Sequence, residues 1–354
     1  MTSRGLLTPT NGVVAVVVLL LVALPTFGTR FFVEFVATQT LIYGLIAATI
    51  VFLTSLGGMI SLAQLLMAGI AGFMFGNAAL ASGARGLNLG WTAWSSVLFA
   101  LGVTTVVAFL LGALASRTSG IYFLMLTLVY GVIGFNFFAQ VVTISGPGGV
   151  TSIVAPEPFT RPVTLYYGAL GASVVAYLLF RGIGRTNFGL ALQGVRDDPV
   201  RMSSLGYNVA LHRTLAFTLG GLIAGVGGLL NVWWRGQIDP ASIAIGPTLA
   251  LLIIAVIGGI SYFEGAWLGA FVYVLLNTYT GSIPLIDRVG LTPDRFNTVI
   301  GLIVILIMVL SPEGLVGILD RVSRGRGLGS PNEHSVEPPT TSQATVQTSS
   351  GRQP

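Results

Sequence analysis

The chain has no cysteine and no lysine, and its 354 residues include only two histidines, His212 and His334. The absence of cysteine excludes disulfides and thiolate metal sites, and two histidines are too few for a multi-histidine metal site. The absence of lysine excludes the nucleotide-binding loop in which a lysine contacts the phosphates. We therefore expect no bound metal, no cofactor, no catalytic residues and no ATPase activity of that type in this chain.

Charged residues are scarce as well. They make up 8% of the chain, whereas 53% of the residues are apolar, and an ordinary soluble domain is about a quarter charged. This composition excludes a soluble enzyme and a disordered protein, and it predicts an all-α polytopic membrane protein. The arginines lie between apolar runs and not along one polar face, so the net charge of +5 does not indicate a nucleic-acid partner.

Charge-free apolar runs predict about ten membrane-spanning helices, because a helix needs about 20 apolar residues to cross the bilayer core. We expect two spans within residues 35–84 and one span in each of residues 5–29, 86–116, 118–156, 162–180, 214–234, 240–263, 265–286 and 296–312. The first run could instead be a signal peptide. No cleavage site follows it, which favours an uncleaved span.

An even number of spans places both termini on one side of the membrane. Eleven of the 17 arginines would lie on that side and six on the other, so the positive-inside rule predicts cytoplasmic termini. We expect a transmembrane domain at residues 1–320, which includes a long cytoplasmic loop at 181–213. Residues 321–354 are rich in Ser, Thr, Pro and Gln and are expected to form a disordered cytoplasmic tail.

Two glycine-rich segments resemble each other. Gly57 and Gly58 are followed by Met-Ile-Ser, and Gly258 and Gly259 are followed by Ile-Ser. Paired glycines predict broken helices at these two places, and transporters use broken helices beside the substrate path. For each single glycine, tight helix packing without a role in transport is the alternative interpretation.

The loop at 181–213 contains the signals of a short helix. Asp198 can cap it, Pro199 fits its first position, and Gly206 fits a left-handed stop. Because a two-turn helix is unstable alone, it must pack on its own membrane domain or on a partner. The alternative is a solvated basic loop that only sets the topology.

Within the loop, Arg196-Asp197-Asp198 and Leu205-Gly206-Tyr207-Asn208-Val209 resemble the coupling loop of one family, the permeases of branched-chain amino acid ABC importers (the LivM/LivH type). Further similarities follow the family's order between about Gln39 and Ser311 and comprise Ser61-Leu62-Ala63-Gln64, Arg117-Thr118-Ser119-Gly120-Ile121-Tyr122-Phe123, Leu215-Ala216-Phe217 with Ala224-Gly225, and Val256-Ile257-Gly258-Gly259-Ile260. The departures are Gln64 where histidine is common, Glu264 in a normally uncharged turn, and Ala266 in place of proline.

The resemblance implies half of a membrane pore in the cytoplasmic (inner) membrane of a prokaryote. A second homologous permease subunit would supply the other half, two cytoplasmic ABC ATPase subunits would hydrolyse ATP, and an extracytoplasmic solute-binding protein would deliver a branched-chain or related amino acid. The residues expected to couple the pore to the ATPases are Arg196, Asp197, Asp198, Arg201 and Gly206.

Other functions remain open at this point. A sugar or nucleoside permease of the same ABC superfamily has the same organisation, and a secondary transporter would work without ATPases. A membrane prenyltransferase would need a second acidic cluster besides Asp197-Asp198, and the sequence has none.

Polar residues inside the apolar runs are candidates for the translocation path, because burying them in lipid is costly. The candidates are Ser61, Gln64, Asn77, Asn136 and Glu264. An interhelical hydrogen bond is the alternative role for each amide side chain. Glu264 lies between two adjacent predicted spans, and we expect it in water at the cytoplasmic end; gating of a cationic group is the alternative.

Overall fold

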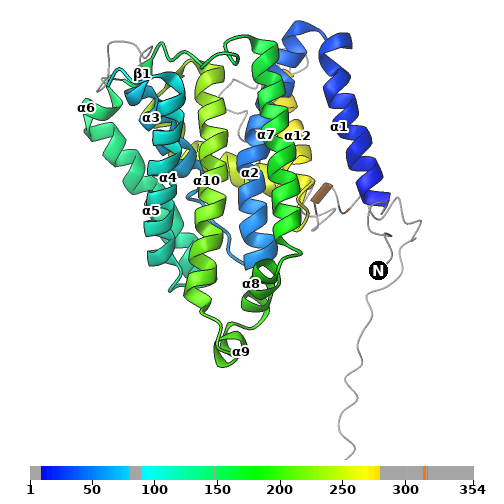
Figure 1. Cartoon of the computed structure of the whole chain (residues 1–354), viewed down its shortest axis with the longest axis vertical. Helices are drawn as coiled ribbons and strands as arrows, with labels where there is room; N and C mark the ends of the chain where they lie inside the picture. The colour runs from blue at the N-terminus through cyan, green and yellow to red at the C-terminus, as the bar shows by residue number, and fades with distance from the viewer. Residues whose placement is uncertain are drawn as a thin grey trace, which may run out of the picture.

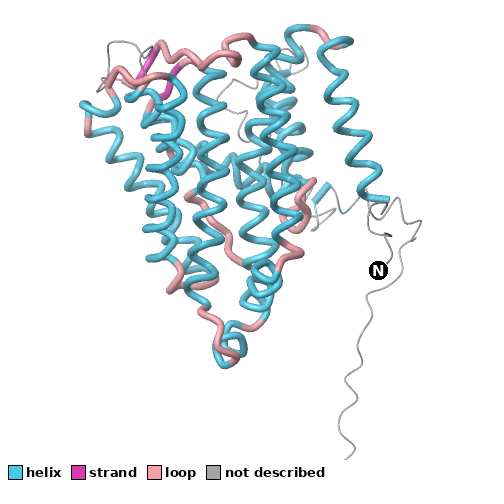
Figure 2. Tube along the Cα trace, in the orientation of Figure 1, coloured by secondary structure: helices cyan, strands magenta, loops and turns pink. Residues whose placement is uncertain are grey.

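The computed structural model describes residues 9–79, 89–146 and 148–279, together with residues 301, 314, 315 and 317. These residues form a helical bundle with short connections (Figure 1; Figure 2). The elements are α1 (Pro9–Phe27), the π-helical η1 (Phe32–Ala37), α2 (Thr38–Gly57), α3 (Gln64–Ala78), α4 (Ala93–Ala115), α5 (Ile121–Gln140), α6 (Val142–Ser145), β1 (Val150–Thr151), α7 (Pro162–Ile183), α8 (Asn187–Asp197), α9 (Pro199–Ser204), α10 (Val209–Arg235), β2 (Gln237–Ile238), the 3₁₀-helical η2 (Pro240–Ile243), α11 (Ile245–Gly258) and α12 (Gly265–Tyr279).

Five described helical segments are long and apolar enough to cross a membrane. They are Phe32–Gly57, which joins η1 to α2, and the helices α4, α5, α7 and α10. Helices α3, α11 and α12 have 15, 14 and 15 residues, and at about 1.5 Å per residue each is shorter than a hydrocarbon core of about 30 Å. The predicted number of ten spans stays a prediction, since residues 296–312 lie outside the described part apart from residue 301.

Helix α2 lies at the centre of the bundle, and its residues are buried almost throughout. A helix that is apolar on all sides belongs in such a position. Helix α10 packs against α2, α3 and α4, and at Gly228 an added Cβ would meet the carbonyl of Ala68 on α3. The absence of a side chain therefore lets these two helices approach closely. Helices α4 and α5 have mostly exposed outer faces.

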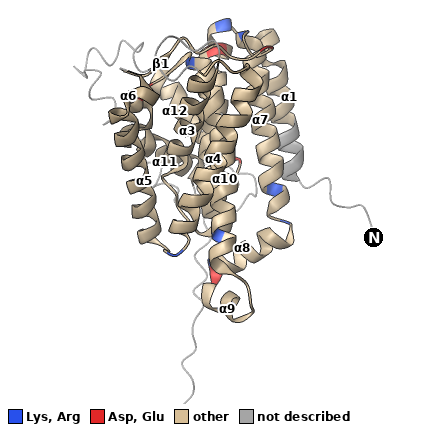
Figure 3. Cartoon of the chain, turned by 60° about the vertical axis from the view of Figure 1, so that its left-hand side comes forward, with Lys and Arg blue, Asp and Glu red and all other residues tan. Residues whose placement is uncertain are grey.

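The charged residues gather at the two ends of the bundle, with few between them (Figure 3). Helix α7 follows Arg161 at one end and carries Arg181 in its last turn at the other, where α8 and α9 extend beyond the helices (Figure 1). Arg213, near the start of α10, donates to the carbonyl of Thr118 between α4 and α5 at 3.3 Å, so that turn lies at the same end. We call this end of the bundle the α8–α9 end. The other end carries the antiparallel pair β1–β2.

Two elements differ from the sequence-based expectation. Residues 187–197 form the amphipathic helix α8, which was not predicted; Gly189, Leu192 and Val195 on one face are buried. The run predicted as a span at 240–263 begins instead with η2, which Asp239 caps by accepting hydrogen bonds from Ser242. Helix α11 then starts at Ile245, which is why it is short.

Candidate functional site

Helix α9 has the capping arrangement predicted from the sequence. The Oδ1 atom of Asp198 accepts a hydrogen bond of 2.9 Å from the N–H of Arg201, Pro199 is the first helical residue, and Gly206 has φ of 89° after the helix end. The cap, the proline and the glycine stop confirm the short helix that the sequence predicts. No residue of α9 is buried.

Apolar side chains on and beside α9 are exposed. Val200 is 75% exposed and Leu205 is 66% exposed, although both are large and apolar. Arg201 lies between them in the sequence and is also exposed. A two-turn helix gains most of its stability from packing. Helix α9 packs against α8, where Met202 lies beside Gly194, and it leaves Val200 and Leu205 uncovered.

Arg196 joins α8 to the end of α2. Its Nη1 donates to the backbone carbonyl of Ser55, which lies in the last turn of α2, where carbonyls lack helical partners. Its Nε also pairs with Asp197 Oδ1 at 2.9 Å. Gly58 follows α2 with φ of 63°, and a Cβ there would collide with the Arg196 side chain. The coupling-loop candidate therefore contacts the segment at which α2 ends.

A buried polar cluster lies in the segment between α2 and α3. Ser61 and Gln64 are fully buried, and Gln64 Nε2 donates to Ser61 Oγ at 3.4 Å. The N–H of Leu62 donates to Thr127 Oγ1 on α5 at 3.1 Å. Gln64 Oε1 is buried without a hydrogen-bond partner in the described part of the chain. An unsatisfied buried oxygen of this kind is costly unless water or a ligand reaches it.

The second glycine-rich segment forms the turn of a helical hairpin. Helix α11 ends at Gly258, Gly259 has φ of 113°, and α12 starts at Gly265. A Cβ on Gly258 would meet the backbone oxygen of Gly265, so the two helix ends are nearly in backbone contact. Whether either glycine pair breaks a membrane-spanning helix stays a prediction.

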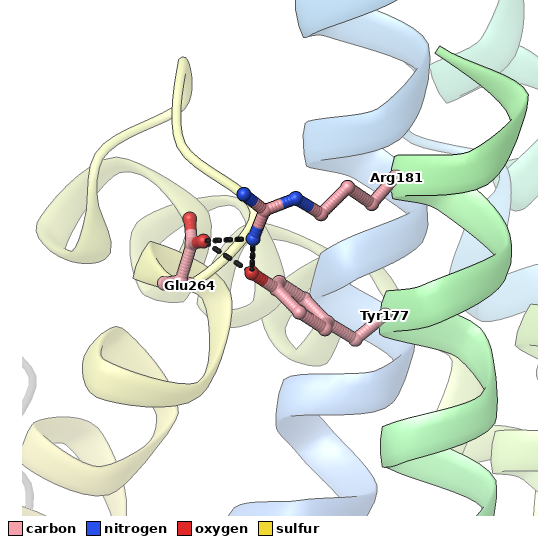
Figure 4. A network of polar contacts seen from close by, with 3 residues as sticks. All are labelled: Tyr177, Arg181 and Glu264. Carbon is pink, nitrogen blue, oxygen red and sulfur yellow. Dashed lines mark hydrogen bonds and ion pairs between the residues drawn. The ribbon is translucent and has the colours of Figure 1, made fainter. Parts of the chain in front are cut away.

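Glu264 lies at this turn and is bound by α7 (Figure 4). Its Oε1 accepts a hydrogen bond of 2.6 Å from the hydroxyl of Tyr177. Arg181 Nη1 donates to the same hydroxyl oxygen at 2.6 Å and lies 3.9 Å from Glu264 Oε1. Glu264 thus lies at the α8–α9 end, where it is 29% exposed and paired with Arg181, and its expected place in water at the cytoplasmic end stays a prediction. The three side chains connect the α11–α12 hairpin to the last two turns of α7.

The remaining path candidates lie apart from one another. Asn77 Nδ2 donates to the carbonyls of Phe73 and Ile144, each at 2.7 Å. Asn136 is exposed on α5 and donates to the carbonyl of Val132 at 2.8 Å. The structure thus brings Ser61 and Gln64 together and places Asn77, Asn136 and Glu264 elsewhere. Their role in translocation stays a prediction.

Sequence reasoning missed a cavity of about 660 Å³ at the end opposite α8–α9. Its lining includes Glu34 of η1 and the run Trp233-Trp234-Arg235 that ends α10. Two tryptophans and an arginine at the end of an apolar run are the sequence signal of a membrane interface, and that signal marks this wall. Glu34 carries no comparable local signal.

The comparisons with known proteins agree on one family. The family model described as branched-chain amino acid transport system / permease component matches residues 32–309. The high-affinity branched-chain amino acid transport system permease protein LivM of Salmonella typhimurium is 25% identical, with 79% of this chain and 69% of the relative covered. LivM of Escherichia coli strain K12 is 26% identical, with coverage of 84% and 72%.

A second kind of relative is also similar. The autoinducer 2 import system permease protein LsrC of Klebsiella pneumoniae is 30% identical over 44% of this chain and 45% of its own length. No solved structure matches the chain significantly. Because the family model covers more than half of the residues and the helices are long and apolar, this chain is a multi-pass membrane protein that belongs to the family of branched-chain amino acid transport system permease components.

Proposed function

We propose that the chain is the permease subunit of an ABC importer that carries branched-chain or related amino acids across the cytoplasmic membrane. Residues 1–320 are the permease domain in this proposal, and 321–354 are a cytoplasmic tail. The observation that carries the proposal is the capped helix α9, which protrudes from the bundle with exposed Val200 and Leu205. Uncovered apolar side chains on a protruding helix suit contact with a partner. Because a chain without lysine lacks the nucleotide-binding loop, ATP hydrolysis would fall to separate subunits.

The contacts of α8 support a route for the coupling. ATPase subunits that close around α9 would engage Asp198, Arg201 and the stop at Gly206. The movement would reach Ser55 through the hydrogen bond from Arg196. The segment beyond it leads to the buried Ser61–Gln64 pair. A displacement of this segment between two packings is the kind of change that interconverts inward-open and outward-open states.

The proposed assembly has the partners that the family resemblance implies. A second homologous permease subunit completes the pore, two cytoplasmic ATPase subunits bind at the α8–α9 ends, and an extracytoplasmic solute-binding protein delivers substrate at the opposite ends. The arginine-rich α8–α9 end faces the cytoplasm in this arrangement, as the positive-inside rule requires.

Reconstitution tests this proposal. The full chain is assembled in liposomes with a homologous permease, ABC ATPase subunits and a solute-binding protein from the same organism, and uptake of labelled L-leucine is measured with ATP and without it. We expect uptake that depends on ATP and on all four kinds of subunit. Uptake by the chain alone, driven by an ion gradient, would replace the proposal with a secondary transporter.

The similarity to LsrC permeases supports a second candidate, since the name of that relative specifies autoinducer 2 import. The pore would then carry a small hydroxylated solute of the sugar or nucleoside kind. Competition distinguishes the two candidates. If unlabelled valine and isoleucine suppress leucine uptake and ribose does not, the amino-acid assignment stands.

A further inference from the structure

The cavity at the end opposite α8–α9 is formed by four separate parts of the chain. They are η1 with the adjoining first residue of α2, Thr38, the loop that contains Ile153 to Thr160, the start of α7, and the last turn of α10 with Gln237 behind it. Its volume of about 660 Å³ lies within the usual range of small-molecule sites, roughly 300–1,000 Å³.

Hydrogen bonds and stacked rings fix the walls of this cavity. Trp234 Nε1 donates to the carbonyl of Glu34 at 2.9 Å, which joins α10 to η1. Phe159 stacks on Trp233 with a centroid distance of 5.6 Å and an interplanar angle of 16°. The N–H of Ile153 donates to the carbonyl of Gly236 at 2.9 Å. The site is therefore largely preformed, which lowers the entropy lost when a ligand binds.

Glu34 and Arg235 are the charged residues among those that line the cavity. They do not pair with each other: the ion pairs within the described residues are Arg181–Glu264 and Arg196–Asp197. Arg235 Nη2 donates to the hydroxyl of Tyr43 at 2.9 Å, which holds the guanidinium while other N–H groups remain. The Glu34 carboxylate has no hydrogen-bond partner in the described ranges. Two residues of opposite charge thus line one aromatic cavity, and no ion pair joins them within the described part of the chain.

We propose that this cavity binds a small zwitterion, with its ammonium group at Glu34 and its anionic oxygens at Arg235. The inference rests on the proposed function in one respect, since a free amino acid is the zwitterion that an amino-acid importer handles. Guanidinium groups bind carboxylates through directed, charge-assisted hydrogen bonds. The rings of Trp233 and Phe159 offer an apolar wall for an aliphatic side chain. A phosphatidylethanolamine headgroup presents the same pairing of charges.

The test measures binding of three probes to the purified full chain in uncharged maltoside micelles. L-leucine carries both charges, leucinamide lacks the carboxylate, and 4-methylpentanoate lacks the ammonium. We expect both analogues to bind about tenfold more weakly than leucine, because each loses one charge-assisted contact. Glu34→Gln should weaken the binding of leucine by the same factor and leave the binding of 4-methylpentanoate unchanged. Arg235→Gln should weaken the binding of leucine and leave the binding of leucinamide unchanged.

Arg30→Gln is the matched control, since Arg30 lies between α1 and η1 at the same end but does not line the cavity. It should bind all three probes like the wild type. Equal affinity of the three probes, or leucine binding that neither cavity variant changes, would overturn the inference.

A second arm separates the two sources of a zwitterion. The leucine affinity is measured again in phosphatidylethanolamine discs. If the leucine affinity is unchanged, the site belongs to the free amino acid. If the lipid lowers the leucine affinity by competition, and Glu34→Gln abolishes this competition, the site belongs to the headgroup. ATP-driven uptake by the assembled importer is measured in parallel. Normal uptake by the wild type with no binding in the cavity would overturn this inference and leave the proposed function standing. Binding in the cavity without ATP-driven uptake would overturn the proposed function and leave the zwitterion site standing.

Discussion

The hydroxyl of Tyr166 donates a hydrogen bond of 2.6 Å to the backbone carbonyl of Leu21. Tyr166 is fully buried on α7, and Leu21 lies in α1 four residues before Pro25. Proline has no N–H, so the helix cannot supply the usual donor to the Leu21 carbonyl. A side chain 145 residues away in the sequence supplies it instead. Since unsatisfied backbone groups are costly in lipid, this bond attaches α1 to the bundle.

Tyr166→Phe should therefore loosen α1. The variant leaves the carbonyl buried without a donor, at a cost of about 1–3 kcal/mol. We expect a lower melting temperature of the purified chain and faster proteolysis near residue 28. Tyr167→Phe is the control, because Tyr167 donates at 3.2 Å to Val22, whose carbonyl can also accept from the helical N–H of Thr26. Equal effects of the two variants would contradict the role of Pro25.

Helix α9 gives a prediction about coupling. Gly206 has φ of 89°, and a Cβ there would meet nothing within 4 Å, so a substitution acts through the backbone alone. Gly206→Val should destabilise the end of α9 by more than about 1 kcal/mol. The variant should be present in the membrane at normal levels, but its ATP-driven uptake should be strongly reduced. Gly206→Asn should retain uptake, since asparagine tolerates positive φ.

The cap of the same helix allows a graded comparison. Asp198→Ala should cost about 1 kcal/mol of local helix stability and give a milder loss of uptake. Ser204→Ala is the control, since the Ser204 hydroxyl only donates back to the Val200 carbonyl within the helix. Pull-down of the ATPase subunits reports assembly alongside uptake. Wild-type assembly and uptake in both Gly206→Val and Asp198→Ala would mean that the loop only sets the topology.

The network of Tyr177, Arg181 and Glu264 should contribute little to stability. Arg181 and Glu264 are 26% and 29% exposed, and partly solvated ion pairs contribute about 0–1 kcal/mol. We expect Glu264→Gln to lower the unfolding free energy by no more than this, with a smaller effect at high salt. A double-mutant cycle with Arg181→Gln measures the coupling directly. A loss well above this range would show that the pair is effectively desolvated.

The outcome for α9 and α8 shows which features local sequence can predict. Helix α9 depends on residues within ten positions of one another, so the cap, the proline and the glycine were sufficient to predict it. The contact of Arg196 with Ser55 joins residues 141 positions apart. No local pattern encodes that contact. The same holds for Glu34, whose place beside Trp234 depends on the packing of η1 against α10.

The path candidates show a different limit. Gln64 and Ser61 are close in sequence and lie together. Asn136 was selected because it is polar within an apolar run, and it lies on the exposed face of α5. Composition identifies polar residues within a span, whereas the face on which each residue lies depends on how the helices pack.

The orientation of the bundle gives the last prediction. The chain has no cysteine, so any introduced cysteine is the only thiol that a maleimide can label. Ser204 is exposed on α9, and Ser95 is exposed in the first turn of α4. Helix α4 runs toward Thr118, which contacts Arg213 at the α8–α9 end, so Ser95 lies at the opposite end.

If the positive-inside rule sets the orientation, a membrane-impermeant maleimide added to intact cells should label Ser95→Cys. It should label Ser204→Cys only after the membrane is permeabilised. Labelling of Ser204→Cys in intact cells would invert the orientation and place α9 out of reach of cytoplasmic ATPases, which would remove the basis of the proposed coupling.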